Sequence, residues 1–103
     1  MKNMLDAIPA EMPEELIETI AGNHNARIER IVSHGHASDE GFWYDQDEDE
    51  FILLLEGEAE LEFEDDILHL KKGDYLTIKA HQKHRVKWTP PDRHTIWLAL
   101  FFI

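Results

Sequence analysis

Two side chains capable of acid–base or ligand chemistry stand at the ends of predicted strands. Glu50 precedes the apolar run FILLL, and its face of that strand continues with Ile52 and Leu54. His84 begins the run HRVKW and shares a face with Val86. Because alternate residues of a strand lie on one face, both polar groups are expected to point into a closed β structure. A carboxylate and an imidazole placed there can hold a metal ion or bind a ligand.

Most of the chain predicts the strands that must position this pair. The segment EAELEFE at 58–64 alternates apolar and acidic residues, which is the period of a half-buried strand. Strands separated by turns at intervals of about 8–12 residues are typical of an all-β sandwich or barrel. The other predicted strands cover residues 26–33, 41–45, 50–56, 67–71, 75–78, 84–88 and 95–103.

The segment MPEELIETIAGN, residues 12–23, predicts a short helix. Pro13 stands at its start, two glutamates follow in the first turn, and Gly22 stands at its end. Its apolar side chains at helical spacing are Leu16, Ile17 and Ile20. We therefore expect an N-terminal extension with a short helix over residues 1–25 and a barrel domain over residues 26–103.

The two strand-end residues also stand at characteristic distances from glycines. Six residues separate Glu50 from Gly57, and ten separate Gly73 from His84. These spacings resemble the two motifs of the cupin superfamily, specifically its small single-domain members, and the similarity covers most of residues 26–102. The resemblance implies an all-β jelly-roll barrel of about six to eight strands whose mouth holds a divalent metal. It implies as ligands two histidines of an HxH element, the glutamate and the later histidine.

The HxH element that the resemblance implies is replaced in this chain. With the shorter family spacing, Tyr44 and Gln46 occupy its two histidine positions, and with the longer spacing Trp43 and Asp45 occupy them. We favour the first alternative because it keeps Tyr44, Gln46 and Glu50 on one strand face. Either way, two imidazoles are lost, which should weaken a metal site.

The remaining candidates form a mixed nitrogen and oxygen set. His81 replaces the family's glycine three residues before His84, so the predicted metal ligands are Glu50, His84, Gln46 and His81. Without cysteine, such a set suits Fe(II), Mn(II), Ni(II) or Zn(II), among which the sequence does not choose. Tyr44 is the candidate catalytic residue, as a proton donor or a hydrogen-bonding partner of the substrate.

Each of these residues also has a structural interpretation. Glu50 can be a strand-end acid paired with a neighbouring cation, and His84 a buried histidine bonded to a backbone carbonyl. His34 and His36 flank a glycine well before the predicted strand, so they are expected to form a loop pair rather than the HxH element. The large aromatic residues predicted to form the core or a pocket wall are Trp43, Phe51, Trp88 and Trp97.

Composition limits the possible functions. With 103 residues the chain has room for one domain, and its formal net charge of −12 argues against sequence-independent binding to nucleic acid. No apolar run approaches the ~20 residues of a membrane span, and no signal peptide is recognised. The absence of cysteine fits a cytoplasmic location.

The apolar C-terminal segment LALFFI is expected to be central in a sheet or covered by a partner, and we expect a homodimer.

Three functional hypotheses follow from these residues. The first is a metal-dependent enzyme that acts on a small organic molecule. The second is a non-catalytic small-molecule binding protein with a degraded metal site, which the missing histidines favour. The third is a purely structural dimer partner. Because one fold hosts many activities, the sequence leaves open whether the protein is an enzyme.

Overall fold

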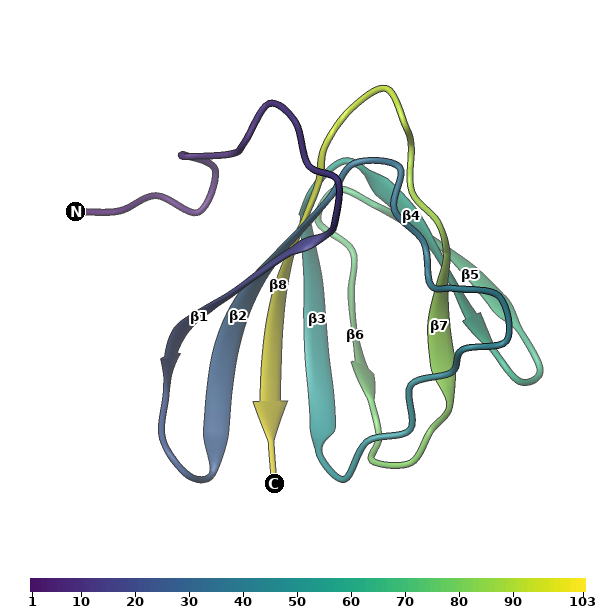
Figure 1. Cartoon of the computed structure of the whole chain (residues 1–103). Helices are drawn as coiled ribbons and strands as arrows, with labels where there is room; N and C mark the ends of the chain where they lie inside the picture. Colours follow the sequence, from purple (N-terminus) through teal and green to yellow (C-terminus); the bar gives the residue numbers. More distant parts are fainter.

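Eight antiparallel strands make up the protein, and a computed structural model describes all residues 1–103. The strands are β1 (Leu16–Gly22), β2 (Ala26–Ser33), β3 (Asp49–Glu56), β4 (Glu58–Phe63), β5 (Ile67–Lys71), β6 (Tyr75–Ile78), β7 (His84–Trp88) and β8 (Thr95–Phe102). One sheet has the order β1-β2-β8-β3-β6 and the other the order β5-β4-β7. The two sheets face each other across the interior (Figure 1). The predicted all-β fold is confirmed.

Strand β8 lies in the middle of the five-stranded sheet, between β2 and β3. Of the two positions expected for the apolar C-terminal segment, the structure therefore shows the central one. Its buried side chains face those of the opposite sheet. The buried apolar cluster between the sheets comprises Ile52, Leu54, Ala59, Leu61, Leu70, Ile78, Trp97, Ala99 and Phe101. The polar residues of the interior lie against this cluster.

The predicted N-terminal helix is wrong, because the same residues form the edge strand β1. Every residue from Leu16 to Thr19 pairs in register with β2, including Ile17 with Ile31, and the register shifts once before Ala21. Three of the seven residues of β1 are β-branched, which lowers helix propensity and raises strand propensity. The exposed edge of β2 supplies the hydrogen bonds that a short isolated helix would have to make alone.

The predicted strand at 41–45 is also wrong. The chain there makes only an isolated bridge between Tyr44 and His84. Gly41, with φ of +81°, turns the backbone just before the aromatic residues. The segment belongs to the long connection from β2 to β3, which crosses in front of β7 in Figure 1.

A buried guanidinium fastens the N-terminal segment to the barrel. Arg30 in β2 is only 5% exposed, and its Nη1 donates to the carbonyls of Met4 at 3.1 Å and Asp6 at 2.6 Å. Its Nε donates to Glu18 of β1 at 2.6 Å. Beyond this point the chain runs outward to its N-terminus (Figure 1). The structure has no helix with the length and apolar character that crossing a membrane requires.

Candidate binding pocket

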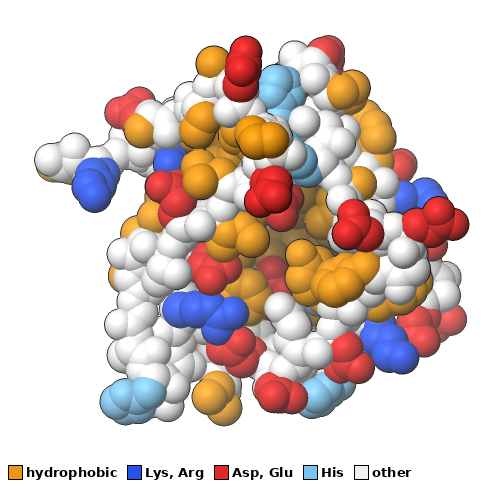
Figure 2. All heavy atoms as spheres, viewed as in Figure 1, with side chains coloured by type: hydrophobic (Ala, Val, Ile, Leu, Met, Phe, Trp, Pro, Cys, Tyr) orange, Lys and Arg blue, Asp and Glu red, His pale blue; other side chains and the backbone are white.

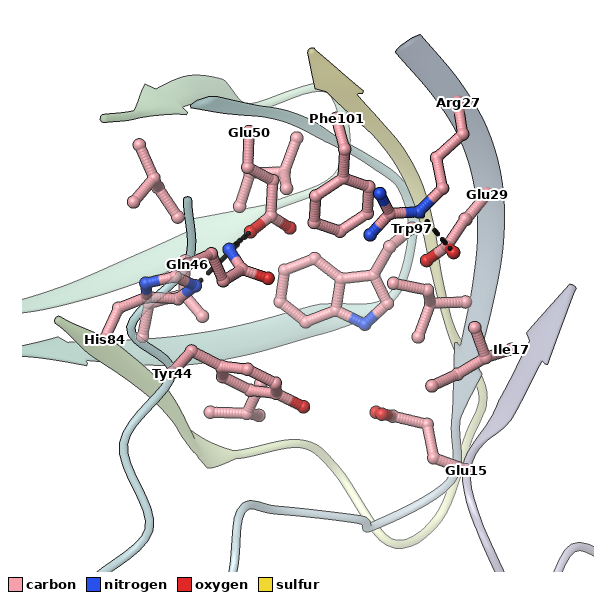
Figure 3. Close-up of a pocket in the computed structure, with 15 residues that line it drawn as sticks. Glu15, Ile17, Arg27, Glu29, Tyr44, Gln46, Glu50, His84, Trp97 and Phe101 are labelled. Carbon is pink, nitrogen blue, oxygen red and sulfur yellow. Dashed lines mark hydrogen bonds and ion pairs between the residues drawn. The ribbon is translucent and has the colours of Figure 1, made fainter. Parts of the chain in front are cut away.

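A pocket of about 270 Å³ lies between the two sheets. Figure 2 shows this face of the molecule hollowed, with apolar side chains inside and acidic side chains around the opening. Most of the lining is apolar, and Trp97 and Phe101 of β8 form an aromatic wall (Figure 3). The polar side chains that line the pocket are Glu15, Arg27, Glu29, Tyr44, Gln46, Glu50 and His84. A largely apolar cavity with a few polar groups is the usual form of a small-molecule site.

Glu50 and His84 meet inside this pocket. Strand β3 carries Glu50 with Ile78 on one side and Phe101 on the other, and the residue is only 7% exposed. His84, at the start of β7 opposite Phe63, is 5% exposed. The imidazole Nε2 lies 3.3 Å from Oε1 of Glu50. Two groups that are 34 residues apart in the chain thus form one buried pair.

The hydrogen bonds of His84 indicate its protonation. Its Nδ1 lies 2.9 Å from the carbonyl oxygen of Gln82, an acceptor, so Nδ1 carries a proton and donates. Nε2 faces a carboxylate, which is also an acceptor. Only the imidazolium can donate from both nitrogens at once. Burial alone would lower the pKa of His84, but the hydrogen bonds to Glu50 and to the carbonyl of Gln82, with the charge of Glu50, raise it above 6.5.

This raised pKa predicts a pH-dependent stability. The stabilisation from charged His84 is fully present below about pH 6.5, its ordinary pKa, and is lost as pH rises through the higher pKa of the folded state. We expect the stability difference between the wild type and His84→Gln to be larger at about pH 6 than at about pH 9. Urea unfolding of both proteins across this range measures it. A difference that stays constant or grows with pH would contradict the charged pair.

Gln46 and Tyr44 approach the same pair from the long β2–β3 connection. The amide nitrogen of Gln46 donates to Oε1 of Glu50 at 3.1 Å (Figure 3). The backbone N–H of Tyr44 donates to the carbonyl of His84 at 2.7 Å, and its ring stacks on the imidazole with centroids 5.4 Å apart. Burial raises the pKa of Tyr44, and the charges of Glu15, Glu50 and Glu29 raise it further. The phenol therefore stays protonated at neutral pH and can donate a hydrogen bond.

His81 does not join this group. Its Nδ1 lies 2.7 Å from Asp45, its Nε2 lies 3.3 Å from Asp47, and its side chain is 63% exposed. The hydrogen bond to Asp45 raises the pKa of His81. Of the two alternatives for the replaced HxH positions, Tyr44 and Gln46 line the pocket, whereas Asp45 points to the surface.

The histidines of the His34-Gly35-His36 segment make structural contacts outside the pocket. Nδ1 of His36 accepts from the backbone N–H of His34 at 2.9 Å, and its Nε2 lies 3.1 Å from the carbonyl of Met12. The ring of His34 packs on His94, with centroids 4.5 Å apart. Neither residue lines the pocket.

The donors in the pocket do not complete the metal set that the cupin resemblance implies. No group of three or more histidine, aspartate or glutamate side chains is placed to hold one metal ion. Of the four predicted ligands, Glu50, His84 and Gln46 are together, and His81 is elsewhere. One imidazole, one carboxylate and one amide fall short of the three or four strong ligands typical of transition-metal sites.

Sequence reasoning missed three further polar residues of the pocket. Glu15 lies just before β1, and its carboxylate accepts a hydrogen bond from Ser33. Arg27 and Glu29 of β2 pair at 3.1 Å, and Arg27 also donates to Glu48 at 2.7 Å. Arg27 and Glu29 share a strand face with Ile31, which was a usable signal for these two residues. Glu15 had none, since its place depends on the unforeseen strand β1.

Trp97 has the expected place in the pocket wall, with one unexpected feature. The side chain is only 4% exposed, and its indole Nε1 is the one buried side-chain polar atom without a hydrogen-bond partner. A buried donor without a partner costs about 1–3 kcal/mol. Buried polar groups are nearly always satisfied, so this donor needs a reason.

Comparison with known proteins places this architecture in a family. The family model of the cupin domain matches residues 29–101, and the chain belongs to the cupin family. The two-sheet fold is accordingly the cupin jelly-roll barrel that the resemblance implied. No curated protein matched the chain significantly.

Solved structures show the same fold. A Ralstonia eutropha protein described as a "putative mannose-6-phosphate isomerase" is 36% identical, with a TM-score of 0.95, and the alignment covers 99% of this chain and 96% of that one. A cupin superfamily protein from Desulfitobacterium hafniense is 23% identical, with a TM-score of 0.78 over 93% and 84% of the chains. A Klebsiella pneumoniae protein with a double-stranded β-helix domain is 16% identical, with a TM-score of 0.79 over 99% and 88%. The last two likenesses concern the fold alone.

Proposed function

We propose that the protein binds a small organic molecule in the pocket between its sheets, through its own side chains rather than through a resident metal ion. The observation that carries this proposal is the buried Glu50–His84 pair, whose facing atoms are 3.3 Å apart and which Gln46 joins at 3.1 Å. These groups already satisfy one another, and they sit in a mostly apolar cavity large enough for a small ligand.

The pocket groups have distinct parts in such binding. Protonated His84 and the amide of Gln46 hold the carboxylate of Glu50 in one orientation, so it can accept a hydrogen bond at its second oxygen without a large rearrangement. The phenol of Tyr44 provides a donor beside them. The apolar walls exclude water, which strengthens these hydrogen bonds.

A second candidate is the metal-dependent enzyme. The 3.3 Å separation of the His84 and Glu50 atoms supports it, because two ligands of one ion also lie close together. It would need further ligands from substrate or solvent. Homodimer formation and a cytoplasmic location stay predictions from the sequence.

Thermal stabilisation by ligands, measured with and without chelator, tests the proposal. A compound that binds only the folded protein raises its melting temperature. We expect at least one small organic compound of a metabolite panel to do so equally with and without EDTA, and to lose most of its effect in Glu50→Gln. Untagged protein is used, since a polyhistidine tag binds metals. Stoichiometric metal in protein purified without chelator, together with ligand shifts that EDTA abolishes, would favour the enzyme instead.

A further inference from the structure

The unsatisfied indole of Trp97 points to a missing hydrogen-bond acceptor. Its nitrogen faces the side of the pocket on which Ile17 and Glu15 lie (Figure 3). The ring belongs to the central strand β8 and is held by neighbours on both sides, so rotation toward another acceptor would disrupt the core. The nitrogen has almost no accessible surface in this structure, so a ligand acceptor reaches and satisfies the donor only when a neighbouring side chain shifts aside.

Two further polar groups line the same pocket as this donor. Figure 3 shows the hydroxyl of Tyr44 and the carboxylate of Glu15 pointing toward each other across the cavity. The charge of Glu15 is the largest electrostatic contribution to the raised pKa of Tyr44, which agrees with their proximity. Ser33, fully buried, fixes Glu15 by its hydrogen bond. The cluster of Trp97, Tyr44 and Glu15, here called the hydroxyl subsite, adjoins the Glu50–His84 pair, because the ring of Tyr44 stacks on His84.

The chemistry of the hydroxyl subsite selects one kind of partner. Trp97 can only donate, an ionised Glu15 can only accept, and Tyr44 can do both. A hydroxyl group both accepts and donates, so the hydroxyl groups of one ligand can satisfy both Trp97 and Glu15, whereas an ammonium group would leave the indole unpaired. Flat aromatic walls formed by Trp97 and Phe101 suit the apolar faces of a ring or chain that carries such groups.

The charge of the pocket disfavours an anionic ligand. Arg27 is the only lysine or arginine in the lining, and it already contacts the carboxylates of Glu29 and Glu48. His84 is paired with Glu50, which leaves the carboxylate of Glu15 without a cation. A phosphate would meet this free carboxylate and no free guanidinium. The pocket therefore differs from what the phosphorylated sugar in the description of the Ralstonia relative would need.

We infer that the pocket takes an uncharged, polyhydroxylated molecule, such as a polyol or an unphosphorylated sugar, and that Trp97, Tyr44 and Glu15 bind its hydroxyl groups. The inference rests on the proposed function, because it names the ligand class of the same pocket.

Nitrogen-labelled protein provides a direct readout. The chain has three tryptophans and therefore three indole N–H signals, which Trp→Phe variants assign. Titration uses D-mannose, D-glucose and sorbitol as neutral probes, mannose 6-phosphate as the anion and tetramethylammonium as the cation. We expect at least one neutral probe to move the Trp97 signal in a saturable way while those of Trp43 and Trp88 stay in place. The phosphorylated sugar is expected to bind about tenfold or more weakly than its neutral parent.

Variants separate the subsite from general stability. Trp97→Phe keeps an aromatic ring and removes the donor, so binding of the neutral probe should weaken about tenfold. Trp88→Phe is the matched control, since Trp88 packs on His69 outside the pocket, and should leave binding unchanged. Tyr44→Phe removes one hydroxyl without altering the packing and should weaken binding about fivefold even if Trp97→Phe does not fold.

The outcomes distinguish this inference from the function on which it rests. Tighter binding of mannose 6-phosphate or tetramethylammonium than of every neutral probe would overturn the inference. So would neutral binding that leaves the Trp97 signal unmoved. In both cases a shift of the His84 ring signals would keep the proposed function standing. If no compound moves the signals of either Trp97 or His84, both the inference and the binding function fail.

Discussion

Gly57→Ala is expected to destabilise the protein by about 3 kcal/mol or more, which is more than Gly73→Ala at the other turn should cost. Gly57 joins β3 to β4 with φ of +85°, a backbone conformation that costs an alanine about 1–2 kcal/mol. A Cβ there would also lie 2.6 Å from the carbonyl oxygen of His94 and 2.8 Å from the Cα of Thr95. These are backbone atoms at the entrance to the central strand β8, so they cannot move without disturbing both sheets. Urea unfolding measures the loss.

Gly73→Ala is the matched control. Gly73 has φ of +90°, nearly the same backbone conformation, but a Cβ at this position would have nothing within 4 Å. We expect it to cost about 1–2 kcal/mol, from backbone strain alone. The difference between the two variants therefore isolates the close approach of the chain at Gly57. Equal losses would show that the approach to β8 does not constrain this turn.

His84→Leu is expected to cost about 3 kcal/mol, because it leaves the carboxylate of Glu50 buried without a charged partner. Glu50→Leu should cost a similar amount, since it leaves the buried imidazole without its carboxylate partner and removes the hydrogen-bond acceptor of Gln46. The double variant should be at least about 2 kcal/mol more stable than the sum of the two losses predicts, because both charges are then gone and apolar side chains fill the pocket.

A double-mutant cycle of urea unfolding at neutral pH measures this coupling. Gln46→Leu serves as the control, because its amide touches the pair but carries no charge, and it should lose about 1 kcal/mol. Strictly additive losses for Glu50 and His84 would mean that the two groups do not interact in solution. That result would remove the support for the proposed binding site, which depends on their pairing.

Part of the fold was predictable because it depends on local patterns in the sequence. The strict alternation of Ala59 and Leu61 with glutamates determines which face of β4 is buried, whatever its neighbours. The same parity placed Glu50 and His84 inward, and both are buried. The prediction of a helix at 13–22 was wrong for a physical reason. Its apolar spacing and end residues are compatible with a helix, but pairing with the free edge of β2 is a long-range interaction that no local pattern records.

The sequence by itself determined the family, the strands β2 to β8 and the inward faces of Glu50 and His84, because strand periodicity and motif spacing are properties of consecutive residues. Only the tertiary structure decided which polar groups meet. It brought Nε2 of His84 within 3.3 Å of Oε1 of Glu50 and turned His81 toward Asp45 at the surface. It also placed Glu15 in the lining of the pocket that Trp97 lines. Such contacts between residues distant in the sequence depend on how the two sheets face each other and how the long β2–β3 connection crosses between them.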